Sequence, residues 1–301
     1  MELTPIVVTL GELAGIGPEI TIKTKQKLKD KIPFFVIGDY NFITSIASKY
    51  SLETKCLQHP SETFSNMDKL CVLQNKSPFP ISPGEINLKN SPSVISNIDK
   101  AVKLIKNGLA SALVTNPINK WALKKGAAFK FEGHTDYLSN LDNPKNPSVM
   151  MLTNKNGFRV VPITVHIPLK EVCKKLTAKL IEDTILTVEE SLRTDFQIDY
   201  PKILVTGLNP HSGESSTIGT EEETLIRPVI LKLLNQGVNV IGPVSADTAF
   251  VEKNRSRFDA FVCMYHDQAL IPIKTLSFSN ESTNITLGLS FVRTSPDHGT
   301  A

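Results

Sequence analysis

Three histidines stand just beyond short apolar runs of the chain, at positions where an α/β protein places its chemistry. They are His166, His211 and His266. Because neighbouring parallel strands end at the same edge of a sheet, side chains far apart in sequence can meet there. Three imidazoles that leave open positions for substrate suit a divalent metal ion. Any one of them alone is more often a structural histidine, so the trio together is the candidate site.

A second group of residues suits the acidic groups of a small molecule. Lys120 follows an apolar run and the dipeptide Asn116-Pro117, while Lys274 and Arg293 flank Asn284 near the C-terminus. Fixed cations beside an amide donor suit a phosphorylated or carboxylated compound. Taken singly, each cation is more often an exposed surface residue.

Two glycine-containing segments also attract attention. The stretch Asn209–Glu223 fits either a loop that contacts phosphate or a loop followed by a capped helix. The segment Gly11–Glu19 superficially resembles a dinucleotide-binding turn. However, Ile20 stands where the GxGxxG fingerprint requires its third glycine, so the usual Rossmann mode of binding is not predicted.

The elements that must position these residues alternate along the chain. Strands are expected at Ile6–Leu10, Phe34–Ile37, Ala112–Thr115, Arg159–Val165, Ile203–Thr206, Val238–Ile241 and Ala260–Met264. Helices are expected at Pro18–Lys29, Val94–Lys106 with Ser93 as its N-cap, Leu176–Leu192, Thr220–Leu234 and Ala246–Val251. Such alternation predicts an α/β fold with a mostly parallel sheet and helices on both faces.

The composition excludes several classes of protein. With 41% hydrophobic and 21% charged residues in 301, the chain has an ordinary globular balance. A net charge of +3 gives no strong field for nucleic acid or a membrane surface, so neither partner is expected. The four cysteines form no CxxC pair, and residues 1–15 lack a signal-peptide pattern. A cytoplasmic location is therefore expected.

Together, these motifs resemble the 4-hydroxythreonine-4-phosphate dehydrogenase family of pyridoxal phosphate biosynthesis. The segments that carry the resemblance are GELAGIGPE (Gly11–Glu19), VTNPINK (Val114–Lys120), GHTDYL (Gly133–Leu138), VHIPLKEV (Val165–Val172), LNPHSGE (Leu208–Glu214), IGTEE (Ile218–Glu222), GPVSADTAF (Gly242–Phe250), MYHDQALIPIK (Met264–Lys274) and NITLGLSFVRTSPDHGTA (Asn284–Ala301). They cover nearly the whole chain in order, and several are long and chemically unusual.

The resemblance implies the fold of the isocitrate and isopropylmalate dehydrogenases, a two-domain α/β/α sandwich with a cleft between the domains. It implies a first domain of residues 1–125 plus 270–301 on the dinucleotide side. The second domain, residues 126–269, would carry the metal histidines and the interface of a homodimer.

The resemblance also assigns roles to individual residues. The metal ligands would be His166, His211 and His266, in a site shared between subunits and holding zinc, magnesium or cobalt. The substrate contacts would be His134, Thr135, Lys274, Asn284 and Arg293. The dinucleotide, NAD or NADP, would contact His298, Gly299 and Thr300. Lys120, Asp247 and Asp267 are three unranked candidates for the general base.

The expected reaction is oxidation of 4-phosphooxy-L-threonine followed by decarboxylation. A dehydrogenase of threonate or erythronate 4-phosphate and a non-catalytic metal-binding homologue remain alternatives, whereas phosphate acyl transfer is disfavoured because it does not need the histidine trio. The sequence departs from the family at Leu13, where a proline is usual. The family also continues past the final motif with a helical tail. Two interpretations of the absent tail stay open: the chain binds NAD more weakly than the family, or the given sequence is incomplete.

Overall fold

The computed structural model describes residues 3–142, 147–277 and 282–301, which fold into two compact units. Unit 1 comprises Met1–Asn143 and Leu289–Ala301, so it draws on both ends of the chain, and unit 2 comprises Pro144–Gly288. The boundaries between the units, at 143/144 and 288/289, lie later in the chain than the predicted boundaries at 125/126 and 269/270. The first difference arises because helix α5 (His134–Asp142) packs against α3 (Ser91–Lys106) of unit 1, and the second because α11 (His266–Leu276) packs on strands of unit 2.

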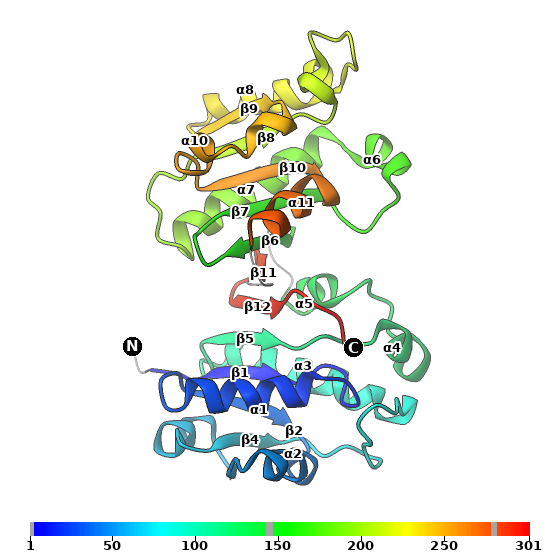
Figure 1. Ribbon diagram of the computed structural model, residues 1–301, viewed down its shortest axis with the longest axis vertical. Coiled ribbons are helices and arrows are strands. Elements are labelled where there is room, and N and C mark those ends of the chain that lie inside the picture. The colour runs from blue at the N-terminus through cyan, green and yellow to red at the C-terminus, as the bar shows by residue number, and fades with distance from the viewer. Residues whose placement is uncertain (1–2, 143–146, 278–281) are drawn as a thin grey trace. The chain divides into compact units, whose positions relative to one another are not determined.

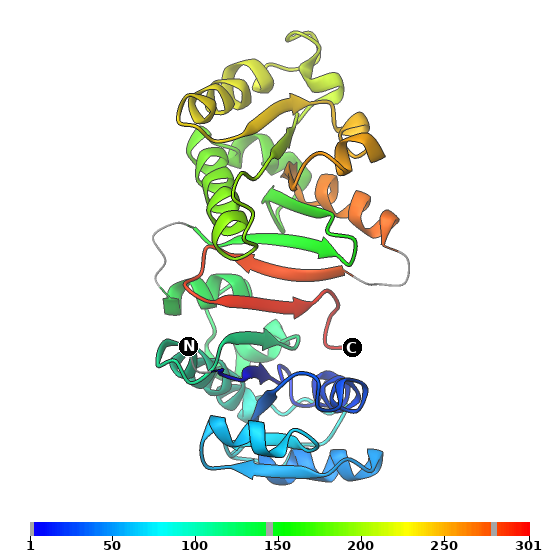
Figure 2. The same cartoon turned by 90° about the vertical axis from the view of Figure 1, so that its left-hand side faces the viewer.

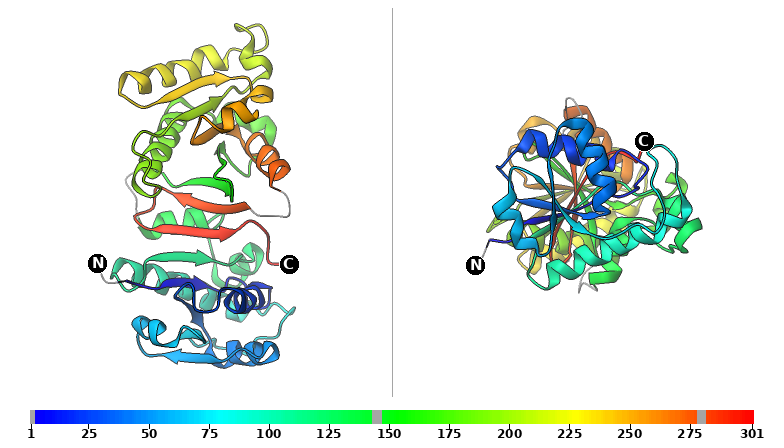
Figure 3. Two further views of the ribbon diagram at one scale, coloured as in Figure 1. Left: turned by 60° about the vertical axis from the view of Figure 1, so that its left-hand side comes forward. Right: turned by 90° about the horizontal axis from the view of Figure 1, so that it is seen from below.

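Unit 1 is a parallel sheet with helices on both faces. Its strands are β1 (Ile6–Thr9), β2 (Phe34–Gly38), β3 (Thr54–Leu57), β4 (Leu70–Gln74), β5 (Ala112–Thr115) and β12 (Val292–Pro296). Its helices are α1 (Gly17–Leu28), α2 (Tyr40–Ala47), α3, α4 (Lys120–Ala127) and α5, with short 3-10 turns η1 (Ser48–Tyr50), η2 (Pro60–Asn66) and η3 (Leu88–Asn90). The strand order is β3-β4-β2-β1-β5-β12 (Figure 1). Helices α1 and α3 cover opposite faces of this sheet (Figure 3, right).

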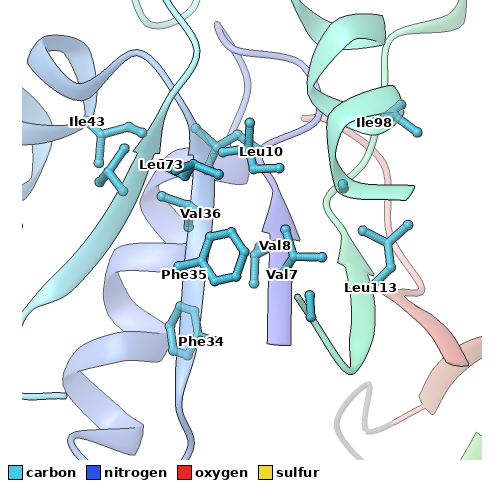
Figure 4. Packing of buried hydrophobic residues seen from close by; sticks show 14 of the residues in the cluster. Val7, Val8, Leu10, Phe34, Phe35, Val36, Ile43, Leu73, Ile98 and Leu113 are labelled. Atoms are coloured by element: carbon cyan, nitrogen blue, oxygen red, sulfur yellow. The ribbon is translucent and has the colours of Figure 1, made fainter. Parts of the chain in front are cut away.

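The core of unit 1 explains why its central strands read as continuous apolar runs. In β2 every residue is buried, and Phe35, Val36 and Ile37 are fully inaccessible to solvent. Figure 4 shows Phe35 and Val36 in one cluster with Val7 of β1 and Leu113 of β5. A strand buried on both faces has no polar side, so it loses the alternation of a half-exposed strand.

Unit 2 has a mixed sheet. Its strands are β6 (Val149–Asn154), β7 (Arg159–Thr164), β8 (Ile203–Thr206), β9 (Val240–Val244), β10 (Ala260–Tyr265) and β11 (Ser282–Leu287). Its helices are α6 (Leu169–Lys175), α7 (Ala178–Thr194), α8 (Arg227–Asn235), α9 (Ala246–Ala249), α10 (Glu252–Arg255) and α11, with the 3-10 turn η4 (Pro210–Gly213) and the π-helical turn η5 (Glu222–Ile226). The order is β11-β6-β7-β10-β8-β9, parallel from β7 onward and antiparallel at β6.

Helices cover both faces of the unit 2 sheet. Figure 2 shows α7, in yellow-green, on one side of the strands and α11, in orange, on the other. Apolar residues of α7 such as Ile181, Ile185 and Val188 are fully buried in one core cluster. A second cluster contains Ala269 and Ile273 of α11. The predicted α/β class with helices on both faces is therefore confirmed.

Local predictions from the sequence succeed where a buried strand alternates with an amphipathic helix. The bounds of β5 and β8 agree with the prediction, and the other predicted strands agree to within a few residues. Ser93 as an N-cap is wrong. The turn η3 leads directly into α3, so the helix begins at Ser91 with Asn90 at its N-cap, and the Ser93 hydroxyl donates to the Asn90 carbonyl inside the helix.

No helix in the described parts of the chain is long and apolar enough to cross a membrane.

Candidate functional site

Two of the three predicted metal histidines come together in unit 2. His166 follows β7, and His266 is the first residue of α11, directly after β10. Since β7 and β10 are adjacent parallel strands, their carboxyl ends bring the two side chains to one edge of the sheet. The ring centroids lie 5.5 Å apart and the ring planes are inclined at 46°. The strand-end argument from the sequence therefore brings this pair into proximity.

His211 is positioned by a different kind of structure. It lies in η4, after β8, which pairs with the other side of β10. Its side chain is 65% exposed, and Nδ1 lies 3.8 Å from Oε2 of Glu214. Among the residues that the structure describes, no group of three histidine, cysteine or acidic side chains in the single chain is close enough to hold a metal ion. The metal site and all three of its ligands therefore remain a prediction.

The two candidate acidic bases each lie beside one of these histidines. Oδ1 of Asp267 is 3.7 Å from Nδ1 of His266. Asp247, on α9, accepts a hydrogen bond from the Ser245 hydroxyl at 2.5 Å. That hydrogen bond is the main cause that lowers the pKa of Asp247, and the nearby His211 lowers it further. Both carboxylates are therefore placed next to imidazoles.

Lys274 and Asn284 also belong to unit 2. Lys274 is on α11, and its Nζ lies 3.4 Å from the hydroxyl of Ser282 on β11. Asn284 is on β11, and its side-chain Oδ1 is buried without a hydrogen-bond partner among the described residues. An unsatisfied buried oxygen is costly, so it marks a place where a donor from a ligand would be favourable.

The remaining predicted substrate contacts gather in unit 1 around Arg293. This β12 side chain is only 3% exposed, and its Nε and Nη2 donate to the hydroxyl of Thr115 at 3.2 and 2.6 Å. Burial lowers the pKa of Arg293 to about 10, so the guanidinium stays charged at neutral pH. Strand β5, which ends at Thr115, pairs directly with β12 and sets this contact.

His134 lies near this buried guanidinium, at the start of α5. Burial is the main cause that lowers its pKa well below the usual value, and the positive charges of Arg293 and Lys120 lower it further. Its Nε2 is buried with no hydrogen-bond partner among the described residues. Lys120 begins α4, and its side chain lies close to Gly133. Thr135 is the next residue of α5. Two cations beside a neutral imidazole form an environment that suits an anion.

The C-terminal residues predicted to contact a dinucleotide lie against the glycine-rich turn before α1. The carbonyl of Thr300 accepts a hydrogen bond from the backbone N–H of Ile16 at 3.1 Å. A Cβ at Gly15 would lie 2.8 Å from the same carbonyl, so residue 15 must be glycine for this approach. In the same region, Nδ1 of His298 lies 2.9 Å from the carbonyl oxygen of Gly299.

Sequence reasoning missed two buried polar residues that shape the strand ends of unit 2. Gln268 accepts from the Thr206 hydroxyl and the Met264 N–H and donates to the Gly207 carbonyl, which ties β8 to β10. Glu222 is fully buried and bonds to the segment that leads to His211. Both lie inside motifs that the sequence singled out, but their roles depend on partners up to 62 residues away.

Comparison with known proteins assigns the family. The model of the pyridoxal phosphate biosynthetic protein PdxA matches residues 30–301. The chain belongs to the PdxA family. Among curated PdxA relatives, the 4-hydroxythreonine-4-phosphate dehydrogenase of Paracoccus denitrificans is 44% identical over 303 residues, which cover 100% of this chain and 91% of the relative. The protein of the same name from Roseobacter denitrificans is 43% identical and covers 99% of this chain and 89% of the relative.

The solved structures lead to the same PdxA family. The crystal structure of 4-hydroxythreonine-4-phosphate dehydrogenase from Klebsiella pneumoniae matches with a TM-score of 0.88 and 34% identity. The match covers 99% of this chain and 92% of that structure. The arrangement of strands and helices described above is thus that of the PdxA fold.

Proposed function

We propose that the chain oxidises 4-phosphooxy-L-threonine to 2-amino-3-oxo-4-phosphooxybutanoate with NAD or NADP. This product then loses carbon dioxide to give 3-amino-2-oxopropyl phosphate, a step of pyridoxal phosphate biosynthesis. The observation that carries the proposal is a match to relatives named 4-hydroxythreonine-4-phosphate dehydrogenase over essentially the full chain. The pairing of His166 with His266 supports it, because it supplies two of the three donors that the expected metal requires.

A divalent ion fits the residues present. The imidazoles of His166 and His266 are ligands of a type that zinc or cobalt prefers, and His211 of the partner subunit would be the third ligand in a homodimer. The exposed His211 side chain is compatible with a role outside its own subunit. When bound, such an ion (zinc, cobalt or magnesium) lowers the pKa of an alcohol and polarises a carbonyl, which are the needs of both steps.

The chain's own cations would bind and orient the substrate. The buried Arg293 is already held by Thr115, so it can bind a phosphate or carboxylate with little loss of side-chain freedom. The unpartnered Nε2 of His134 and the hydroxyl of Thr135 would add polar contacts. In unit 2, Lys274 would supply a further cation, and the free Oδ1 of Asn284 would accept from a substrate N–H or O–H.

The proton of the alcohol must pass to a base. Asp247 and Asp267 are carboxylates beside histidines, and Lys120 lies beside the His134 region. A base must lie within hydrogen-bond reach of the proton it removes. Asp247, Asp267 and Lys120 are therefore the three candidates, and the position of the bound substrate would decide among them. A bound nicotinamide would supply the redox chemistry by accepting the hydride, and His298, Gly299 and Thr300 would hold the adenosine end.

The direct test is turnover by the purified protein with added zinc, cobalt or magnesium. Reduction of NAD or NADP and release of carbon dioxide are measured with 4-phosphooxy-L-threonine, threonate 4-phosphate and erythronate 4-phosphate. We expect the highest kcat/KM and carbon dioxide release with the first compound. Preference for either of the other two would assign the related dehydrogenase. No turnover and no saturable NAD binding would leave the non-catalytic metal-binding function.

A further inference from the structure

The loop that carries His211 has an unusual backbone. All six residues from His211 to Ser216 have positive φ angles, between 42° and 78°. Only Gly213 among them adopts such a conformation without a steric penalty. Side chains of L-residues disfavour the left-handed region, so a run of this length persists only where the surrounding structure holds it.

The carboxylate of Glu222 provides such a hold. Its Oε1 accepts the backbone N–H groups of Leu208 and Asn209, at 2.8 and 2.7 Å. Its Oε2 accepts from the side-chain amide of Asn209 at 3.0 Å. Three donors at the base of the loop therefore converge on one fully buried side chain.

The backbone is folded tightly around this carboxylate. A Cβ at Gly213 would lie 2.6 Å from Oε2 of Glu222, and one at Gly207 would lie 3.1 Å from Oε1. The two glycines stand on either side of His211 in the chain. The carboxylate is thus hydrogen-bonded to the segment before the histidine and lies close against the segment after it.

Glu222 and the next residue, Glu223, point in different directions from the same helical turn. Glu222 and Glu223 open the π-helical turn η5, a geometry that is frequent at functional sites. Glu222 points inward to the His211 loop, whereas Glu223 is exposed and pairs with Arg227. Two adjacent carboxylates in the same turn therefore have different partners, and this provides a matched control.

We propose that Glu222 is a positioning residue for metal binding: its buried carboxylate holds the loop in which residues 211–216 are left-handed and thereby sets the direction of the His211 imidazole. The inference rests on the proposed role of His211 as a metal ligand. The carboxylate suits this task because it accepts from all three donors at once. Glutamine would turn an NH2 group toward at least one of them.

The test compares Glu222→Gln with Glu223→Gln in the metal-free full-length protein. Binding of Co²⁺ is titrated by its visible absorption, and backbone hydrogen exchange is measured for residues 208–216. We expect Glu222→Gln to weaken Co²⁺ binding by roughly 10–100-fold. It should also speed exchange in the loop without metal, while Glu223→Gln changes neither. Wild-type Co²⁺ affinity in Glu222→Gln would overturn the inference.

Two further variants separate this inference from the proposed function. If His211→Ala weakens Co²⁺ binding but Glu222→Gln does not, the positioning role is wrong and the ligand role stands. If His211→Ala leaves binding unchanged, the ligand role itself is wrong and the positioning role falls with it. Should Glu222→Gln not fold, Glu222→Asp keeps the charge but shortens its reach. It should bind Co²⁺ more weakly than wild type, and unchanged affinity would contradict the proposal.

Discussion

The Arg293 region of unit 1 and the histidine region of unit 2 differ in how complete they are within one chain. Arg293 is 3% exposed and already bonded to Thr115, near His134, whose Nε2 is buried. In unit 2, His166 and His266 are paired, but His211 is 65% exposed. The first region is desolvated and preorganised, as strong binding of an anion requires. Among the described residues, the second brings together two histidines, so metal chemistry there would depend on a further ligand supplied by assembly.

The strongest test of whether the histidine region depends on assembly is to mix two inactive variants. His211→Ala and His266→Ala, each alone, should lose turnover by roughly 100-fold or more because each removes a metal ligand. If the ligands come from different subunits, a hybrid dimer keeps one intact site of its two. Unfolding and refolding an equal mixture should then restore about a quarter of wild-type turnover.

The control for this experiment is a mixture of His166→Ala with His266→Ala. Both of these substitutions affect the pair that lies within one chain. Each hybrid dimer would then have one defect in each site, so the mixture should remain inactive. Recovery in neither mixture would contradict a shared site and would require all three ligands to come from the same subunit.

A second prediction concerns the Arg293 region of unit 1. Arg293→Ala should raise KM for the phosphorylated substrate by roughly 10–150-fold, the equivalent of about 1.5–3 kcal/mol for a hydrogen bond to a charged group. The KM for NAD should change much less. Steady-state kinetics with each substrate varied in turn measure both values. A matched control is Arg159→Ala, because Arg159 is a half-buried arginine at the start of β7, the opposite end of that strand from His166.

For this pair of variants, thermal unfolding shows whether a kinetic change reflects loss of structure. Arg159→Ala should lower stability, because its guanidinium donates to the Gly157 and Asp259 carbonyls, while leaving both KM values near wild type. Equal increases in both KM values for Arg293→Ala would argue against a role in substrate binding.

The smallest expected effect concerns pH and His134. Its pKa is lowered in the folded state, so below about pH 6.5 the unfolded chain binds a proton that the folded chain does not. Stability should therefore be unaffected by His134 above that pH. As the pH falls from 6.5 toward the folded-state pKa, stability should decrease by at most about 1.4 kcal/mol per pH unit.

Urea unfolding of wild type and His134→Gln at several pH values measures this contribution. Glutamine keeps a polar group but does not titrate, so the variant should lose part of the acid sensitivity. The same slope in both proteins would show that His134 is not held neutral. A bound phosphate should reduce the difference, because an anion near Arg293 and Lys120 offsets two of the causes that lower this pKa.

The sequence predicted the local elements and the placement of chemistry at strand ends. Buried runs such as Ala112–Thr115 and Ile203–Thr206 have no polar side, so their limits are visible in the sequence. Strands β6 and β11 were missed: both carry polar residues, and they form an antiparallel pair by contacts between distant segments. Pairing of this kind leaves little periodic signal in either segment alone.

What the sequence determined by itself is the family and the set of reactive side chains, since both depend on residue types in a fixed order. Tertiary structure decided which of them meet. His166 lies near His266 because β7 pairs with β10, and Arg293 reaches Thr115 across 178 residues because β12 pairs with β5. Strand order and burial arise from packing between distant segments, so neither the buried charge of Arg293 nor the hold of Glu222 on the His211 loop could be derived from local pattern.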